Sequence, residues 1–235
     1  MSKMPKFAPV EDKKSPSDVF LPKIKPGETI EFVCLTGVKP PVGEEQTTKN
    51  SVIDFYEYTM WKEGLGPGEY SPRFPMLSEG KPGESGTLEG HEDPGKVLGL
   101  DPVMRGMMLV APSEKGKPTG EEKIYSFGIS IYKQLLKIED GLEESLKGKV
   151  LRVSRTGSGR TDTRYMVMAT GKSVEVTGEP ELDMIDYVGP TTYDEIIDLL
   201  VRTGNWKKQE EKSEPKKKSP FAKAGDEEFK YSEDE

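Results

Sequence analysis

The order of the predicted elements constrains the fold more than any single motif. Three short β-branched and apolar runs, each bounded by glycine or proline, are typical of strands: residues 29–37, 52–61 and 103–111. Residues 129–138 instead carry apolar side chains at helical spacing, which predicts an amphipathic helix capped by Ser126 or Ser130. A loop of glycine, serine, threonine and aspartate then joins two further strands, 149–155 and 163–169, in a predicted hairpin.

Three strands, a helix and a hairpin follow the order of a small Greek-key barrel of the OB type, in which a helix connects the third and fourth strands. The expected class is mainly β with α: an OB-fold-like five-stranded barrel spanning residues 29–205. Residues 1–28 are expected to form an N-terminal arm. A further strand at 173–177 and a short helix at 193–201, capped by Thr192 and ending near Gly204, complete the domain.

Two segments depart from this pattern. Residues 64–97 are rich in glycine and proline and contain no cysteine, so they are predicted to be an irregular insertion, the least ordered part of the domain, and to bind no zinc. Residues 206–235 form a Lys-rich linker and an acidic tail, whose composition predicts disorder because it cannot bury enough apolar surface.

The content of metal-binding and redox residues is low. A single cysteine, Cys34, excludes an internal disulfide, and with one histidine, His91, the chain has too few ligands for a structural zinc site. Cys34 lies in an apolar run and is expected to be a buried thiol, while His91 is expected in a solvated loop. We predict no metal and no cofactor. The absence of a signal peptide or of a membrane-spanning run predicts a soluble, cytoplasmic protein.

Charge is distributed unevenly along the chain. The net charge is −8, yet residues 147–172 contain seven basic residues and one acid, Asp162. Residues 226–235 contain six acids and one lysine. Locally concentrated arginine in an acidic protein predicts a polyanionic ligand, and therefore nucleic acid.

The basic residues gather on the predicted hairpin. Strand alternation assigns Arg152 and Ser154 to one face with Arg164, Met166 and Met168, opposite Leu151, Val153, Tyr165 and Val167. Arg155 falls at the strand end, and Arg160 lies in the loop. Gly157-Ser158-Gly159 joins two strands and lacks the Gly-Lys-Ser/Thr of a phosphate-binding loop, so it is interpreted as a flexible turn.

Aromatic residues in 55–61 offer stacking surfaces on a second strand, although strand alternation requires half of them to be core. We expect Tyr56 and Tyr58 to be the exposed pair. The full set of predicted nucleic-acid contacts is Tyr56, Tyr58, Trp61, Lys62, Lys133, Lys149, Arg152, Arg155, Arg160, Arg164 and Tyr165.

The acidic tail is the second candidate site. Two aromatic residues interrupt its acids, which suits docking into a pocket with a basic rim rather than a role in solubility alone. The predicted partner-binding residues are Asp226, Glu227, Glu228, Phe229, Tyr231, Glu233, Asp234 and Glu235.

A family resemblance rests on three stretches: Ile131-Tyr-Lys-Gln-Leu-Leu136, Gly148-Lys-Val-Leu-Arg-Val-Ser-Arg-Thr-Gly-Ser-Gly159 and Asp162-Thr-Arg-Tyr-Met-Val167. Together they resemble the core of single-stranded-DNA-binding proteins of tailed bacteriophages. The resemblance implies an OB-fold core, binding without sequence preference and a partner-recruiting acidic C-terminus in the infected host cell. It also implies that Arg152, Arg155, Arg164 and Tyr165 line the DNA groove. Some members hold zinc in the long insertion, and the lack of cysteine in 64–97 departs from that pattern.

The leading hypothesis is a non-enzymatic protein that coats single-stranded DNA during phage replication, recombination and repair and recruits other proteins of these processes through its tail. The alternative keeps the barrel but binds RNA or anneals strands. A third hypothesis is a nuclease or polymerase accessory factor. The acids Asp183 and Asp186 belong to no paired-carboxylate set with metal-binding geometry, which disfavours catalysis. The oligomeric state stays open.

Overall fold

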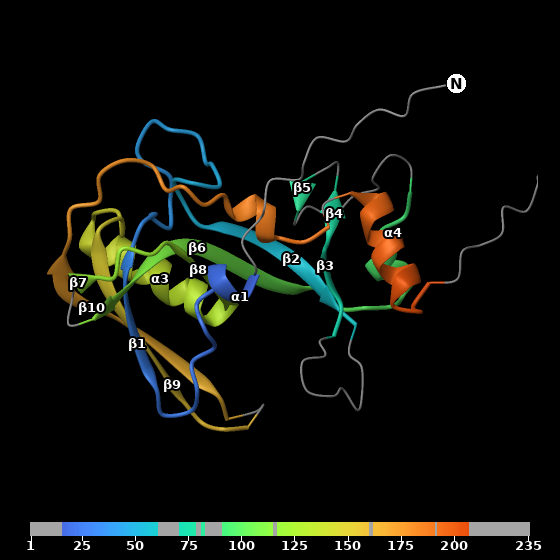
Figure 1. The fold of residues 1–235 in the computed structure, drawn as a ribbon, viewed down its shortest axis with the longest axis horizontal. Helices are drawn as coiled ribbons and strands as arrows, with labels where there is room; N and C mark the ends of the chain where they lie inside the picture. The colour runs from blue at the N-terminus through green and yellow to red at the C-terminus, as the bar shows by residue number, and fades with distance from the viewer. Residues whose placement is uncertain are drawn as a thin grey trace, which may run out of the picture.

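A computed structural model describes residues 16–60, 71–78, 81–82, 91–114, 117–159, 162–190 and 192–206. It is mainly β with a few helices, and its centre is an antiparallel sheet of eight strands (Figure 1). The general α+β class predicted from the sequence is therefore confirmed. None of the described helices is long and apolar enough to cross a membrane.

The elements follow one another in a simple order along the chain. The helices are α1 (Pro16–Val19), α2 (Pro94–Val97), α3 (Ile129–Leu142), the 3-10 helix η1 (Met184–Tyr187) and α4 (Tyr193–Arg202). The strands of the main sheet are β1 (Thr29–Cys34), β2 (Ile53–Thr59), β3 (Arg73–Pro75), β6 (Val103–Glu114), β7 (Lys117–Pro118), β8 (Lys123–Gly128), β9 (Lys149–Thr156) and β10 (Arg164–Ser173). The strands β4 (Leu77–Ser78) and β5 (Lys81–Pro82) pair only with each other.

Strand β6 organises the sheet. Its first half pairs with β2 (Ile53 opposite Met107) and its second half with β1 (Cys34 opposite Val110), so β1 and β2 lie end to end along one edge. Strand β8 pairs along the other edge, from Arg105 to Val110. Beyond β1 come β9 and then β10. The resulting order is β8–β6–β1–β9–β10, with α3 joining β8 to β9 in the chain.

The sheet is open where a closed barrel would pair β8 with β10. Among the described residues those strands share no ladder, and each edge has another partner. The N–H of Leu21 donates to the carbonyl of Ile124 on β8 (2.9 Å). The side-chain amide of Gln134 on α3 donates to the Tyr165 carbonyl (3.1 Å) and accepts from the Val167 N–H (3.0 Å) on β10. The predicted closure into a five-stranded barrel is therefore not made by backbone pairing.

Apolar side chains cover both faces of the sheet. Helix α3 packs its buried Ile131 and Leu135 on one face, against Phe32, Tyr125 and Leu151 among others. Cys34 lies fully buried in this core, as predicted, and burial raises the pKa of its thiol. On the opposite face, the chain that follows β10 crosses the sheet: Val174 and Val176 pack against β1, β6 and β9, and Leu182 and Met184 pack against β6 and β8 together with Val19 of α1.

The described residues of the predicted irregular insertion include β3 and α2 and pack in a further apolar cluster at the far end of β2. Tyr58, Phe74 and Met76 pack there with Ile196 and Leu200 of α4. His91 is exposed, as predicted, and stacks on Tyr193 of α4 with ring centroids 4.3 Å apart. Gly95 of α2 lies against the Tyr58 ring so closely that an added Cβ would fall 2.3 Å from it. In the part of the insertion that the structure describes, apolar packing holds the segment to the sheet, and no cluster of metal-binding side chains occurs there.

The helix predictions are confirmed in position and corrected in detail. Helix α3 begins at Ile129 after Gly128, which provides no side-chain cap, so neither Ser126 nor Ser130 caps it. Helix α4 follows Thr192 as predicted, and Thr192 and Glu195 form a reciprocal capping box. The strand predicted at 173–177 is absent, because β10 ends at Ser173 and the following residues pack across the sheet without a ladder.

Candidate nucleic-acid interface

Strand β9 presents its side chains alternately to the two faces of the sheet. Leu151 and Val153 are fully buried in the core with α3, whereas Arg152 is exposed on the opposite face. The antiparallel register places Arg164 opposite Thr156, Met166 opposite Ser154, and Met168 opposite Arg152. The alternation predicted for the hairpin is therefore confirmed. These six residues, Arg152, Ser154, Thr156, Arg164, Met166 and Met168, are called the hairpin face below.

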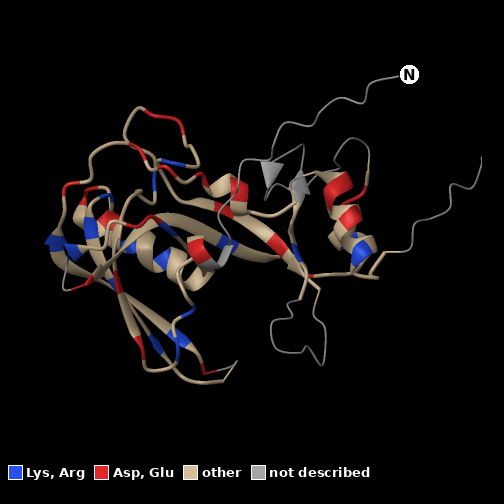
Figure 2. Cartoon of the chain, in the orientation of Figure 1, with Lys and Arg blue, Asp and Glu red and all other residues tan. Residues whose placement is uncertain are grey.

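The two arginines of the hairpin face differ in their surroundings. Arg164 is exposed at the start of β10. Arg152 forms an ion pair with Glu31 of β1 (3.0 Å), whose other carboxylate oxygen accepts a hydrogen bond from Ser113 (3.0 Å). Four residues of strand separate the two register positions, or ~13 Å. Figure 2 shows basic segments on the β9–β10 hairpin beside an acidic segment of β1.

Two methionines complete the hairpin face: Met166 lies between the two arginine positions along the strands, and Met168 lies directly opposite Arg152. The exposed fractions are 52% for Met166 and 41% for Met168, which is unusual for large apolar side chains on a sheet. A thioether is polarizable and packs well against aromatic rings. The hairpin face therefore combines two cations with an apolar strip on a rigid pair of strands, a combination suited to a ligand with both phosphates and flat rings.

The other face of the hairpin holds Arg155 and Tyr165, which are opposite each other in the register. The Arg155 guanidinium donates to the carbonyl of Ile24 (2.9 Å) and to the hydroxyl of Thr163 (3.4 Å). Its Cζ lies 5.9 Å from the centre of the Tyr165 ring. The register therefore places Arg155 and Tyr165 on the face opposite Arg152 and Arg164, because strand positions an odd number of residues apart face opposite ways. This arrangement does not support the expectation that all four residues line one groove.

The aromatic prediction on β2 is half confirmed. Tyr56 is exposed (43%), but Tyr58 is fully buried and packs against Phe74 and Gly95. Burial, followed by the adjacent Asp93 carboxylate, raises the pKa of Tyr58 to about 12. Tyr58 is therefore a core residue of the insertion and not a stacking surface, since the insertion and α4 cover its side of β2.

The remaining predicted contacts are dispersed. Lys133 is exposed on α3, and Lys149 is half-buried and paired with Glu144 (2.5 Å). Trp61, Lys62, Arg160 and the tail residues 226–235 lie outside the described residues. The structure thus brings Arg152 and Arg164 together on one surface and leaves Tyr56, Lys133 and Lys149 elsewhere.

Sequence reasoning missed a charge cluster at the root of the insertion. The buried carboxylate of Glu57 pairs with Arg105 (2.6 Å) and Arg73 (3.7 Å), which connects β2, β6 and β3. Because the Glu57 carboxylate neutralises both arginines, the cluster stabilises the contact between these strands and is poorly suited to binding a phosphate. Its sequence signal is weak, since the three residues are far apart in the chain.

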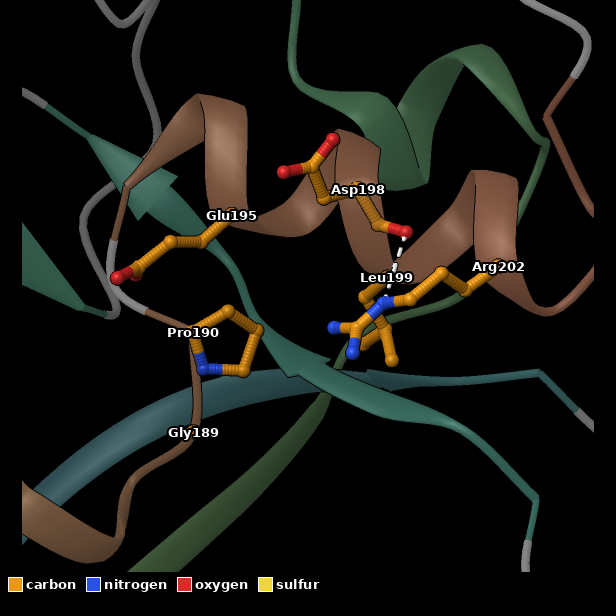
Figure 3. Close-up of a pocket in the computed structure, with 6 residues that line it drawn as sticks. All are labelled: Gly189, Pro190, Glu195, Asp198, Leu199 and Arg202. Carbon is orange, nitrogen blue, oxygen red and sulfur yellow. Dashed lines mark hydrogen bonds between the residues drawn. The ribbon is translucent and has the colours of Figure 1, made fainter.

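An open pocket of about 370 Å³ lies beside α4, far from the hairpin (Figures 1 and 3). Gly189 and Pro190 line it from the segment before the helix, and Glu195, Asp198, Leu199 and Arg202 from α4. The Arg202 Nε donates to the Asp198 carbonyl (3.3 Å). With two carboxylates and one arginine, this pocket does not attract a polyanion.

Comparisons of the chain with protein-family models, with curated proteins and with solved structures find no match. The functional argument therefore rests on the geometry of the hairpin face.

Proposed function

We propose that this protein binds single-stranded DNA without sequence preference and without catalysis, as an OB-type protein that protects exposed strands during phage replication, recombination and repair. The observation that carries the proposal is the hairpin face, where Arg152 and Arg164 share one surface with the exposed Met166 and Met168. The strand order β8–β6–β1–β9–β10, with a helix between β8 and β9, supports an OB-type core in which β1 and β2 together serve as the first strand.

The chemistry of this face favours single strands. Arginine pairs with phosphate oxygens through its planar fork and fixes the strand without identifying its bases. Exposed methionine side chains can pack against unstacked bases, and such contacts tolerate any sequence because every base has a flat face. In a duplex the bases are stacked inside, so only the arginines would contribute. Binding should therefore be stronger for single strands.

Fluorescence titrations of the full chain with oligo-dT, oligo-U and a duplex of equal length test the proposal. We expect the tightest binding to oligo-dT and a strong fall in affinity with salt, about −0.7 in the log–log slope for each phosphate neutralised. Equal affinity for single strands and duplex would contradict the proposal. Preferential binding of oligo-U would indicate that the ligand is single-stranded RNA instead of DNA.

Glu31 should weaken DNA binding, because its carboxylate occupies the Arg152 guanidinium that a phosphate would need. We expect Glu31→Gln to tighten oligo-dT binding by up to about fivefold at low salt, the scale of an ion pair in which one partner, Arg152, faces solvent. Glu28→Gln is the matched control: it makes the same charge change next to the same strand but on a residue paired with Lys25 instead. An equal gain in both variants would show a general charge effect and contradict a specific role of Glu31.

We further propose that the acidic tail competes with DNA for the basic surface and recruits replication or recombination proteins. Residues 226–235 carry net charge −5 and are tethered to the domain, which raises their effective concentration near it. Deleting them should tighten oligo-dT binding at low salt, with a smaller gain near physiological salt, where the Debye length is about 8 Å. A truncation titrated at both salt concentrations checks this, and an unchanged low-salt affinity would contradict competition.

Recruitment should depend on the aromatic residues of the tail as well as on its acids. Phe229→Ala combined with Tyr231→Ala keeps every charge, so a pull-down of replication proteins with this variant separates the two contributions.

A further inference from the structure

Arg155 holds three separate segments together at the base of the hairpin loop. Its guanidinium donates to the Ile24 carbonyl of the N-terminal arm and to the Thr163 hydroxyl at the start of β10. Its backbone N–H donates to the Glu28 carbonyl (3.1 Å), and its carbonyl accepts from the Gly27 N–H (2.9 Å). The same side chain lies over the Tyr165 ring. The arm, the loop and the return strand thus meet at one residue.

Thr163 extends this connection into the loop. Its hydroxyl donates to the Gly159 carbonyl (2.5 Å), and the Gly159 N–H donates to the Asp162 carboxylate (2.6 Å). Gly157 has a φ of 78°, and an added Cβ there would lie 2.2 Å from the Asp162 carbonyl oxygen. Short-range hydrogen bonds therefore fix the described part of the loop. The pairing of Thr156 with Arg164 joins the loop ends to the sheet, and the Arg155–Thr163 contact adds a side-chain link from β9.

The charge of Arg155 is not presented to a ligand on the hairpin face. The side chain is half-buried on the opposite side of the sheet, and its Nε is buried with no acceptor within the described residues. A phosphate bound to Arg152 or Arg164 would lie on the other face of β9. Arg155 can therefore influence that phosphate through the position of the loop and of β10, but not by contact.

We propose that Arg155 is a positioning residue for DNA binding: it fixes the hairpin loop against the arm, and so sets the geometry of Arg164 and the loop, without contacting the nucleic acid. This inference rests on the proposed function. We infer that DNA affinity depends on the shape of the Arg155 guanidinium and not on its charge. Lysine would keep the charge but lacks the fork that reaches Ile24 and Thr163 together.

Titrations of Arg155→Ala and Arg155→Lys with oligo-dT over a salt series test the proposal under conditions where circular dichroism shows each variant folded. We expect both variants to bind about tenfold more weakly with a salt slope equal to that of the wild type. The control, Arg164→Ala, should lower the magnitude of the slope by about 0.7, and Arg164→Lys should restore most of it. Wild-type affinity of either folded Arg155 variant, or a slope reduced by about 0.7 in Arg155→Ala, would overturn the proposal.

Two further measurements keep the test decisive. If the Arg155 variants do not fold, Thr163→Val removes the hydroxyl that accepts from Arg155 and donates to Gly159, and we expect it to bind a few-fold more weakly with an unchanged slope. Wild-type affinity of Thr163→Val would then overturn the proposal. Hydrogen exchange without DNA should show lost protection in Arg155→Lys around residues 24–28 and 156–164 but not in α3. This readout is independent of DNA, so unchanged exchange counts against Arg155 as the link even if the wild type fails to bind single strands and the proposed function falls.

Discussion

Replacing Glu139 by alanine is expected to lower the free energy of unfolding by about 4 kcal/mol, a large part of the stability of a domain this size. The Glu139 carboxylate is buried at the end of α3 and accepts three backbone hydrogen bonds: from Val38 (2.8 Å), Lys39 (2.9 Å) and Leu146 (2.9 Å). Alanine would leave these three amide groups without their acceptor. Val38 and Leu146 are buried, so their amides carry a desolvation cost, whereas Lys39 is exposed and its amide can turn to water.

Urea denaturation of the full chain measures this effect. Glu144→Ala is the matched control, because Glu144 lies five residues further on and is exposed in an ion pair with Lys149. We expect no resolvable change there, since exposed ion pairs contribute little. Glu139→Gln should fall between the two, because its amide keeps one acceptor oxygen. If Glu139→Ala were as stable as the control, the carboxylate would not be the link between α3 and the loop after β1.

The strand positions could be predicted because alternation and glycine or proline boundaries are local signals. The same signals do not predict β8, the strand that immediately precedes helix α3. They also could not show that the sheet stays open. Its edges are covered by Leu21 and by Gln134, which are remote in sequence from the backbone groups they bind. Such pairings depend on tertiary packing, which no local pattern specifies.

In the candidate site, too, local sequence patterns predict some features, and others depend on tertiary packing. Alternation correctly assigned Arg152 and Arg164 to one face and Tyr165 to the other. Alternation does not show which face of β2 is exposed to solvent. Tyr58 was therefore expected at the surface, whereas Phe74 and Gly95 bury its ring. The resemblance to phage proteins placed Arg155 and Tyr165 in the groove with Arg152, which their opposite side of the sheet does not support. The partner of Arg152, Glu31, has no sequence signal because it belongs to another strand.

Replacing Arg152 and Arg164 together by alanine should weaken binding to every single-stranded sequence by roughly 100-fold at low salt. A hydrogen bond to a charged group contributes roughly 1.5 kcal/mol, and two such losses correspond to about two factors of ten. Both side chains are exposed, and the Glu31 carboxylate that loses Arg152 keeps its hydrogen bond from Ser113, so we expect a folded variant with a small fall in the thermal midpoint. Lys133→Ala with Lys137→Ala removes two charges from the exposed side of α3 instead, and it should weaken binding far less.

The salt dependence of oligo-dT binding, compared between the wild type and the Arg152→Ala/Arg164→Ala variant, tests most directly that the hairpin face contacts the phosphates. If both arginines neutralise a phosphate, the magnitude of the log–log slope should fall by about 1.4 in the variant, equally for oligo-dT and for a mixed sequence. A slope that stays at the wild-type value in a folded variant would contradict the account and place the DNA on another surface.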